Sequence, residues 1–247
     1  MKARLIILLA VLLVPVTARS AEIKLLASAA LRGAYLDLLP QFEKTSGHTV
    51  NAAWSSSPDI RKRIAGGEAA DVVILSSSGA QELIKEQKLA ADSRTDFARS
   101  GISVAVRSGA PKPDIGSADA VKTAVLAARS IAWSGGASGL YIVRMLEKLG
   151  ISDQVKTKTA IVKPGEPVGE VVARGEAEIG FHQLSELIPV KGIEIVGPLP
   201  PELQHITLFS GGIAAGAKEP EAARALIRFL TAPAAAAGLK QHGLTPG

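Results

Sequence analysis

The sequence predicts an α/β fold of two lobes joined by a pair of crossover strands. Apolar runs alternate with amphipathic stretches in a β-α-β-α-β order from residue 22 to about residue 90, which is typical of a sheet covered by helices. A second α/β series follows. A long apolar strand at 101–109 precedes it, and another at 205–216 ends it. We therefore expect residues 22–100 and 208–247 to form the first lobe and residues 101–207 the second.

The first series begins with EIKLLAS, residues 22–28, which is typical of a buried strand. The next segment carries Leu31, Tyr35, Leu38 and Leu39 at helical spacing, and its helix is expected to stop at Gly47. The remaining elements expected in this series are a strand at 48–54, a short helix that Pro58 opens, a strand at 71–76 and a helix at 79–87.

The second series has the same character. Pro220 and the glutamates on either side of it favour a helix start, so an Ala-rich helix is expected at 220–230. The other elements expected are helices at 120–128, 138–150 and 166–176, strands at 101–109, 130–134, 177–183, 193–197 and 205–216, and a short helix or turn at 232–243.

Residues 1–20 have the pattern of a signal peptide. Lys2 and Arg4 precede the apolar run LIILLAVLLVPV, and small residues follow it, so cleavage is expected after Ala18, Ser20 or Ala21. The run is short for a membrane-spanning helix, which needs about 20 apolar residues; a retained anchor is the alternative. The mature protein is therefore expected in the periplasm. The chain has no cysteine, which excludes a disulfide, a thiolate centre and a lipid-modified cysteine.

The amino-acid composition and charge limit the kinds of molecule that the protein is expected to bind. Of the 247 residues 47% are hydrophobic, enough for a packed core, and the formal net charge is +5. Lys and Arg are scattered and no basic run is interleaved with aromatic residues, so no nucleic-acid partner is expected. A mild positive charge suits a small anionic ligand better.

Four serine-containing segments each follow an expected strand and open an expected helix. They are ASAAL (27–31), SSSPD (55–59), SSSGA (76–80) and SGGASGLY (134–141). The first backbone N–H groups of a helix have no partner within the helix and attract anions, and a serine hydroxyl can add a further donor. Serine is also the common helix cap, so each segment alone could be a plain cap. Four such segments on two lobes favour an anion site between the lobes.

Known catalytic motifs are absent. GGASG resembles a nucleophile elbow, but Leu140 stands where that motif needs glycine. The four histidines have no His-x-x-x-His spacing, which argues against a zinc site, and the glycine order of a dinucleotide loop is missing. We therefore expect no catalytic residue, no cofactor and no metal other than one carried within an oxyanion ligand. An exported hydrolase remains a third alternative, because a catalytic triad need not show in sequence.

Several stretches together resemble the periplasmic molybdate-type substrate-binding proteins of ABC importers. They are residues 25–76, ASGLYIVRMLEKLG (137–150), VVARGEAEIGF (171–181) and 212–236, so the resemblance covers nearly all of the expected mature chain. It implies the type II periplasmic binding protein fold and a monomer that captures a molybdate- or tungstate-like oxyanion between its lobes. It also implies delivery to an ABC transporter permease in the membrane.

The resemblance also implies a set of ligand-binding positions. The serine of the family's second loop falls on Ser57, and that of its first loop falls on Ala30, where the hydroxyl is missing and Ser28 could replace it. The family's hinge tyrosine falls near Gln183, beside His182. The full set expected to bind ligand is Ser28, Ala29, Ala30, Ser56, Ser57, Ser138, Gly165, His182 and Gln183.

The changed donors leave other ligands open. A glutamine amide with a histidine beside it suits a carboxylate or another oxyanion, so a small organic acid is the alternative ligand; His182 could instead be purely structural. A sensor or scavenger without a transporter is the alternative role. We expect Ser57→Ala to weaken ligand binding with little loss of fold, because the loop should be exposed when the lobes are open.

Overall fold

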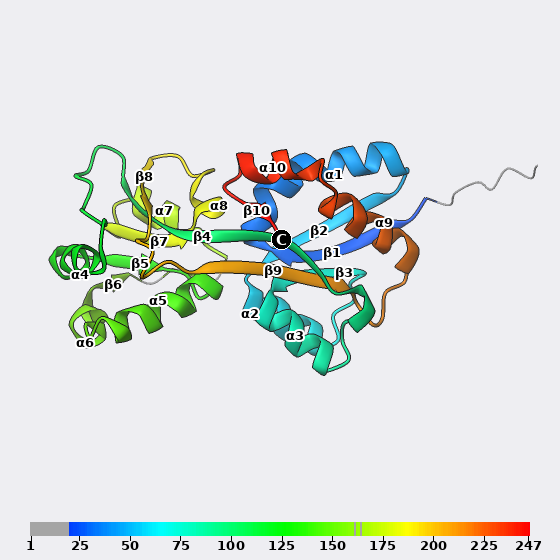
Figure 1. Cartoon of the computed structure of the whole chain (residues 1–247), viewed down its shortest axis with the longest axis horizontal. Coiled ribbons are helices and arrows are strands. Elements are labelled where there is room, and N and C mark those ends of the chain that lie inside the picture. Colours follow the sequence, from blue (N-terminus) through cyan, green and yellow to red (C-terminus); the bar gives the residue numbers. More distant parts are fainter. Residues whose placement is uncertain (1–19, 161, 164) are drawn as a thin grey trace, which may run out of the picture.

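The computed structural model describes residues 20–160, 162–163 and 165–247. The predicted n-region and apolar run of the signal peptide lie outside the described residues, and the cleavage site stays a prediction. Two α/β lobes lie side by side, and two long strands run from one to the other (Figure 1). Among the described residues, no helix has the length and apolar character needed to cross a membrane.

The first lobe is built on three parallel strands. They are β1 (Glu22–Ser28), β2 (Thr49–Ser55) and β3 (Val72–Ser76), in the order β2-β1-β3. The helices of this lobe are α1 (Arg32–Ser46), α2 (Ser57–Ala65), α3 (Ser77–Lys85), α9 (Pro220–Thr231) and α10 (Ala235–Gln241). The predicted elements of the first series are therefore confirmed, with ends that move by a few residues.

The connection between the lobes is made by β4 (Thr95–Arg107) and β9 (Ile206–Ile213), which pair antiparallel. Up to Gly101 the partner of β4 is β9, and from Ile102 onward it is β7 (Ile179–Gln183) and β8 (Ile193–Pro198). One continuous sheet results, in the order β2-β1-β3-β9-β4-β7-β5-β6. The residue boundaries assigned to the lobes stay a prediction.

The start of β4 differs from the sequence prediction by six residues, since that strand was expected to begin at residue 101. The added segment contains Asp96 and Arg99, so it lacks an apolar run. It is a strand because it pairs with β9, and the Asp96 carboxylate accepts a hydrogen bond of 2.6 Å from the Ser210 hydroxyl on that strand.

The second lobe contains the remaining elements. They are α4 (Ala118–Ala127), β5 (Ile131–Trp133), α5 (Ala137–Lys148), α6 (Ser152–Val155), β6 (Thr159–Ala160), α7 (Val168–Ala173) and α8 (Leu184–Leu187). A short strand, β10 (Thr245–Pro246), pairs with β4. The sequence did not predict α6, α8, β6 and β10, because helices of a single turn and strands of two residues are too short to show a periodic pattern.

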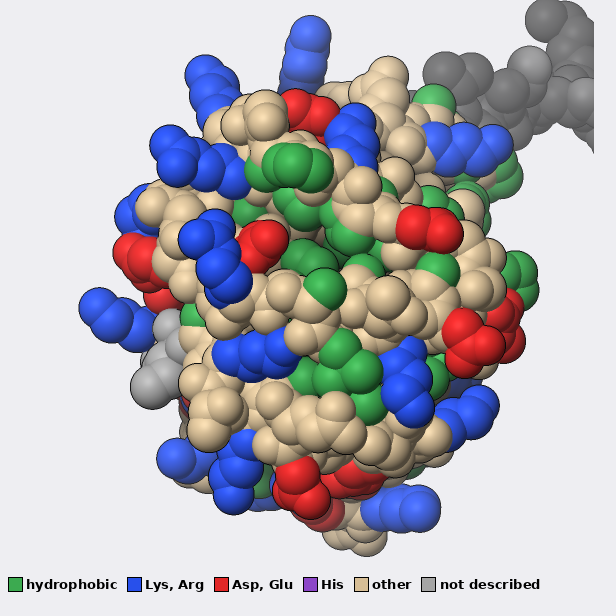
Figure 2. Space-filling model, turned by 90° about the vertical axis from the view of Figure 1, so that its left-hand side faces the viewer, with side chains coloured by type: hydrophobic (Ala, Val, Ile, Leu, Met, Phe, Trp, Pro, Cys, Tyr) green, Lys and Arg blue, Asp and Glu red, His purple; other side chains and the backbone are tan. Residues whose placement is uncertain are grey.

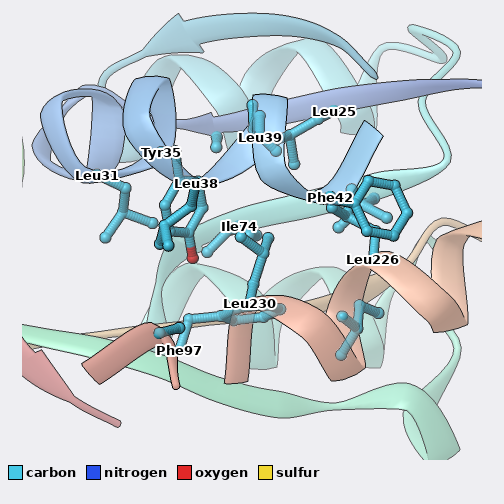
Figure 3. Close-up of a cluster of buried hydrophobic side chains, with 14 of the residues drawn as sticks. Leu25, Leu31, Tyr35, Leu38, Leu39, Phe42, Ile74, Phe97, Leu226 and Leu230 are labelled. Atoms are coloured by element: carbon cyan, nitrogen blue, oxygen red, sulfur yellow. The ribbon is translucent and has the colours of Figure 1, made fainter. Parts of the chain in front are cut away.

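Each lobe has its own core. In the first lobe, Tyr35 and Phe42 of α1 and Leu226 of α9 cover one face of the sheet against Leu25 and other strand residues (Figure 3). A second cluster lies under α2 and α3, and the second lobe is packed separately around β4, β5 and β7. Because each lobe is packed separately, the space between them does not have to be filled to stabilise either one.

The charged surface agrees with the scattered charges of the sequence. Figure 2 views the molecule from the end formed by the second lobe, and Lys and Arg side chains are spread over this face with Asp and Glu among them.

Candidate functional site

A cavity of about 550 Å³ opens between the lobes. Most of its lining comes from the segments that follow β1 and β2 in the first lobe and β5 and β7 in the second, and residues 165–167 before α7 add to it. All nine positions predicted to bind ligand line this one cavity: Ser28, Ala29, Ala30, Ser56, Ser57, Ser138, Gly165, His182 and Gln183. The structure therefore brings the predicted set together, and ligand binding by each residue stays a prediction.

The register of the first-lobe sheet creates the first wall of the cavity. Strands β1 and β2 are parallel and Ser28 lies opposite Ser55, so the loops that follow both strands leave the sheet at the same edge. The side chain of Ser28 is buried and makes no hydrogen bond with any described residue. Its hydroxyl is therefore available to a ligand, whereas Ala30 two residues later offers none.

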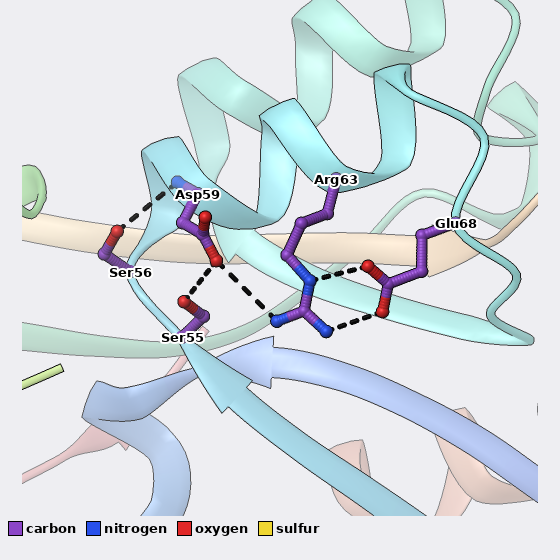
Figure 4. Close-up of polar contacts among 5 residues, drawn as sticks. All are labelled: Ser55, Ser56, Asp59, Arg63 and Glu68. Carbon is purple, nitrogen blue, oxygen red and sulfur yellow. Dashed lines mark hydrogen bonds and ion pairs between the residues drawn. The ribbon is translucent and has the colours of Figure 1, made fainter. Parts of the chain in front are cut away.

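The second loop combines a helix cap with a contact to a neighbouring strand. The Ser56 hydroxyl accepts a hydrogen bond of 3.3 Å from the Asp59 backbone N–H and so caps α2 (Figure 4). The Ser57 hydroxyl accepts a hydrogen bond of 2.8 Å from the Ser76 backbone N–H. Ser57 is only 4% exposed, so the expectation that this position is exposed is wrong. Its hydroxyl proton can still be donated to a ligand.

The second lobe contributes a tight turn before α5. The Ser134 hydroxyl accepts a hydrogen bond of 3.2 Å from the Gly136 backbone N–H. A Cβ atom at Gly139 would lie 1.5 Å from the Ser134 carbonyl oxygen, so the glycine of GGASG permits this close approach. Ser138 is buried in the first turn of α5 and makes no side-chain hydrogen bond with any described residue. The GGASG sequence therefore forms a tight turn and leaves the Ser138 hydroxyl free.

One of the four serine-containing segments does not reach the cavity. Ser76, Ser77 and Ser78 are not among its lining residues. The Arg94 guanidinium donates a hydrogen bond of 3.3 Å to the Ser77 hydroxyl instead. The hypothesis that all four segments meet in one anion site is therefore wrong, and three of them line the cavity.

The carboxyl end of β7 carries two buried polar side chains that face the cavity. The Gln183 amide donates a hydrogen bond of 2.7 Å to the Thr207 hydroxyl, and its Oε1 atom has no partner among the described residues. The Nδ1 atom of His182 is also buried without a hydrogen-bond partner there, and it lies 3.5 Å from Oε2 of Glu186. Burial raises the pKa of the Glu186 carboxyl, and the nearby His182 opposes that rise only in part.

Sequence reasoning missed the charged residues of the cavity. Arg32 begins α1 and forms no ion pair with any described residue, while Glu186 follows β7. Glu166 also lines the cavity, but Arg174 holds it in an ion pair of 2.6 Å and lowers its pKa. The position of Arg32, directly after an expected anion-binding loop, was the one available signal, and it was obscured by the scattered distribution of charge along the chain.

No metal centre is evident in the described part of the chain, where no group of three or more His, Asp or Glu side chains gathers. Asp71 lies at the opposite end of β3 from the serine loops. Its carboxylate accepts hydrogen bonds from the backbone N–H groups of Lys24, Lys218 and Glu219, at 2.7 to 3.1 Å. It therefore acts as a structural cap.

Comparisons with known proteins agree with this architecture. Residues 23–245 match the family described as bacterial extracellular solute-binding protein. The aconitate isomerase of a Pseudomonas species is 41% identical over 227 residues, which cover 90% of this chain and 86% of that protein. The molybdate-binding protein ModA of Escherichia coli is 24% identical over 229 residues, covering 91% and 89%. The solved periplasmic molybdate-binding protein of Azotobacter vinelandii superposes with a TM-score of 0.73 at 21% identity, covering 91% and 99%, and shows the type II fold.

Proposed function

From the premise that the chain belongs to the bacterial extracellular solute-binding protein family, we propose that it holds a small polycarboxylate of the aconitate kind between its lobes and interconverts the isomers of that acid. The observation that carries the ligand class is Arg32, a cation in the cavity without an ion-pair partner among the described residues. A guanidinium matches the two oxygens of a carboxylate with paired hydrogen bonds, which favours an organic acid over a ligand held by neutral donors alone.

The rest of the cavity fits a ligand with several carboxylates. A volume of about 550 Å³ lies in the usual range for small-molecule sites and far exceeds the space that one tetrahedral oxyanion occupies. Ser28 and Ser138 offer free hydroxyls from opposite lobes, so separate carboxylates of one ligand can bind to separate lobes. Because Glu166 is already paired with Arg174, its charge is partly compensated before an anion enters.

The catalytic part of the proposal is supported by the relative named aconitate isomerase. The sequence-based expectation of a binding protein without catalysis remains a prediction, and the experiment below decides it. We further propose a periplasmic location and an ABC transporter permease as partner, which the family and the molybdate-binding relatives support. That the protein is a monomer stays a prediction.

Calorimetric titration of the purified protein with cis-aconitate, trans-aconitate, molybdate, tungstate and sulfate tests the ligand class. We expect both aconitates to bind, and Arg32→Ala to weaken that binding at least about 10-fold, because the charge-assisted hydrogen bonds of the guanidinium are lost. The matched control is Arg228→Ala, an exposed arginine of α9 outside the cavity. NMR spectra of each isomer incubated with the protein measure the interconversion. Binding of molybdate or tungstate alone would contradict the proposal.

Capture of a molybdate-like oxyanion for an ABC importer is the second candidate function. The specific observation that favours it is the pair of buried hydroxyls, Ser28 and Ser138, which are neutral donors of the kind that a dehydrated oxyanion needs. In that case Arg32→Ala should leave the Kd for molybdate unchanged, whereas Ser138→Ala should raise it.

A further inference from the structure

We propose that His182 is the catalytic residue that carries the proton in this isomerisation, and that Glu186 is the positioning residue that holds its ring. The inference rests on the proposed function and deepens it by naming the acid–base group. It starts from a buried polar atom, Nδ1 of His182, that has no hydrogen-bond partner among the described residues although burial without one is costly.

The position of His182 suits a proton carrier. It is the penultimate residue of β7 and pairs there with Ser103 of β4, and the preceding Phe181 also pairs with β5, so its backbone is held in place while its side chain lines the cavity. A neutral imidazole has one donor and one acceptor nitrogen. Nδ1 lies 3.5 Å from a Glu186 carboxylate oxygen, so the proton is best placed on Nδ1, which leaves the lone pair of Nε2 for the ligand.

Two of the other charged groups in the cavity are less suited to the role. The charged side chains that line it with His182 are Arg32 from α1, Glu166 from the loop before α7 and Glu186 from α8. Arg32 stays protonated, and Glu166 is bound to Arg174, which lowers its pKa and makes it a weak base. The remaining histidines, His48, His205 and His242, do not line the cavity.

The chemistry needs one base and no redox partner. In aconitate a methylene carbon and a vinyl carbon, each with a carboxylate, flank a central carbon. Nε2 of His182 takes a proton from the methylene carbon, and that C–H electron pair becomes the new double bond to the central carbon. The old double-bond pair moves to the former vinyl carbon, which takes the proton back from the imidazolium.

The product has the same atoms and electrons, with the double bond on the other side of the central carbon. Its cis or trans geometry depends on how the ligand is held. Arg32 and the serine hydroxyls can stabilise the negative charge that builds on the carboxylates during the transfer.

The test measures kcat, KM and, by calorimetry, Kd for aconitate in the full protein. We expect His182→Gln to lower kcat at least about 100-fold, the usual size of a general-base contribution, while Kd stays near that of the wild type. Glu186→Gln should lower kcat about 10-fold with KM unchanged, because the ring loses its orientation and the ligand keeps its contacts. The control is His48→Gln, a histidine outside the cavity, which should leave both constants unchanged.

The outcomes separate the two proposals. Turnover by the wild type that persists in His182→Gln would overturn the role of His182 and leave the proposed isomerase intact. A Glu186→Gln variant with unchanged kcat, or with kcat and KM altered together, would overturn the positioning role. Absence of turnover in the wild type would overturn the isomerase itself. If His182→Gln does not fold, His182→Asn serves, because its amide can replace Nδ1 beside Glu186.

Discussion

Residues 55–57 and residues 76–78 are both runs of three serines, and each run lies where a parallel strand of the first lobe ends and a helix begins. The first run lines the cavity between the lobes, and the second does not. The two are also in contact, since the Ser57 hydroxyl accepts a hydrogen bond from the Ser76 backbone N–H. Similar sequences in similar local structures thus have different surroundings.

The position of each strand in the sheet explains the difference. β3 lies beside the crossover strand β9, and Ser76 at its end pairs with Phe209 of that strand. Arg94, which precedes the other crossover strand, binds the hydroxyl of Ser77. β2 is at the edge of the sheet, and the loop after it faces the second lobe. The second run therefore lies against the crossover segment, which engages the Ser77 hydroxyl, while the first run lies at the cavity.

The largest expected effect comes from breaking the contact between β3 and β9. A Cβ atom at Gly211 would lie 1.9 Å from the backbone carbonyl oxygen of Val73, so Gly211→Ala must force the strands apart. We expect a loss of about 3 kcal/mol in the free energy of unfolding, measured by denaturant titration. Gly216→Ala is the control, because a Cβ atom there meets nothing within 4 Å. Equal stability of the two variants would contradict the explanation above.

A smaller effect is expected from the hydroxyl that joins the two runs. Ser57→Ala leaves the Ser76 backbone N–H without its partner, which should cost about 2 kcal/mol of unfolding free energy. Ser77→Ala removes only a 3.3 Å contact with Arg94 and should change stability by less than about 0.5 kcal/mol. Thermal and denaturant unfolding of both variants measures the difference. A Ser57→Ala protein as stable as Ser77→Ala would contradict the role of the Ser57 hydroxyl in stability.

The helix caps of the two runs should also differ. Ser56 caps α2 through the Asp59 backbone N–H, so Ser56→Ala should cost about 1 kcal/mol. Ser76 holds the same position before α3, but its side chain makes no cap hydrogen bond. Ser76→Ala should therefore be nearly neutral in a denaturant titration. Equal costs for the two substitutions would mean that the caps are equivalent in solution.

The smallest effect concerns the polar network on α2, in which Arg63 binds Asp59 and Glu68 while Ser55 donates to Asp59 (Figure 4). The hydrogen bond from Arg63 lowers the pKa of Glu68 below its usual value. A lowered pKa stabilises the fold above the unfolded-state pKa of about 4.3, and this stability is lost as the pH falls through the folded-state pKa.

The side chains of Arg63 and Glu68 are 31% and 42% exposed, so solvent screens the pair and Glu68→Gln should cost no more than about 0.5 kcal/mol at pH 7. Below the folded-state pKa the cost should vanish. Unfolding curves of the wild type and the variant at a series of pH values measure it, and a difference independent of pH would contradict the assignment.

Much of this architecture could be predicted from the sequence because it depends on near neighbours. Apolar runs predicted β1 and β3, and Pro58 and Pro220 marked the starts of α2 and α9. The resemblance to molybdate-type binding proteins identified nine positions that the structure places around one cavity. Segments with no apolar run, such as the start of β4, could not be predicted, because their strand structure depends on pairing with a partner far along the chain.

The sequence by itself determined the longer helices, the apolar strands and the loops with serine hydroxyls, since periodicity and capping depend on residues within about one helical turn. Only the tertiary structure decided which serine run faces the cavity, that Ser57 is buried against β3, and that Arg32 and Glu186 join the site. These outcomes depend on where β4 and β9 cross between the lobes, because that crossing brings distant segments together and sets which serine run lies at the cavity.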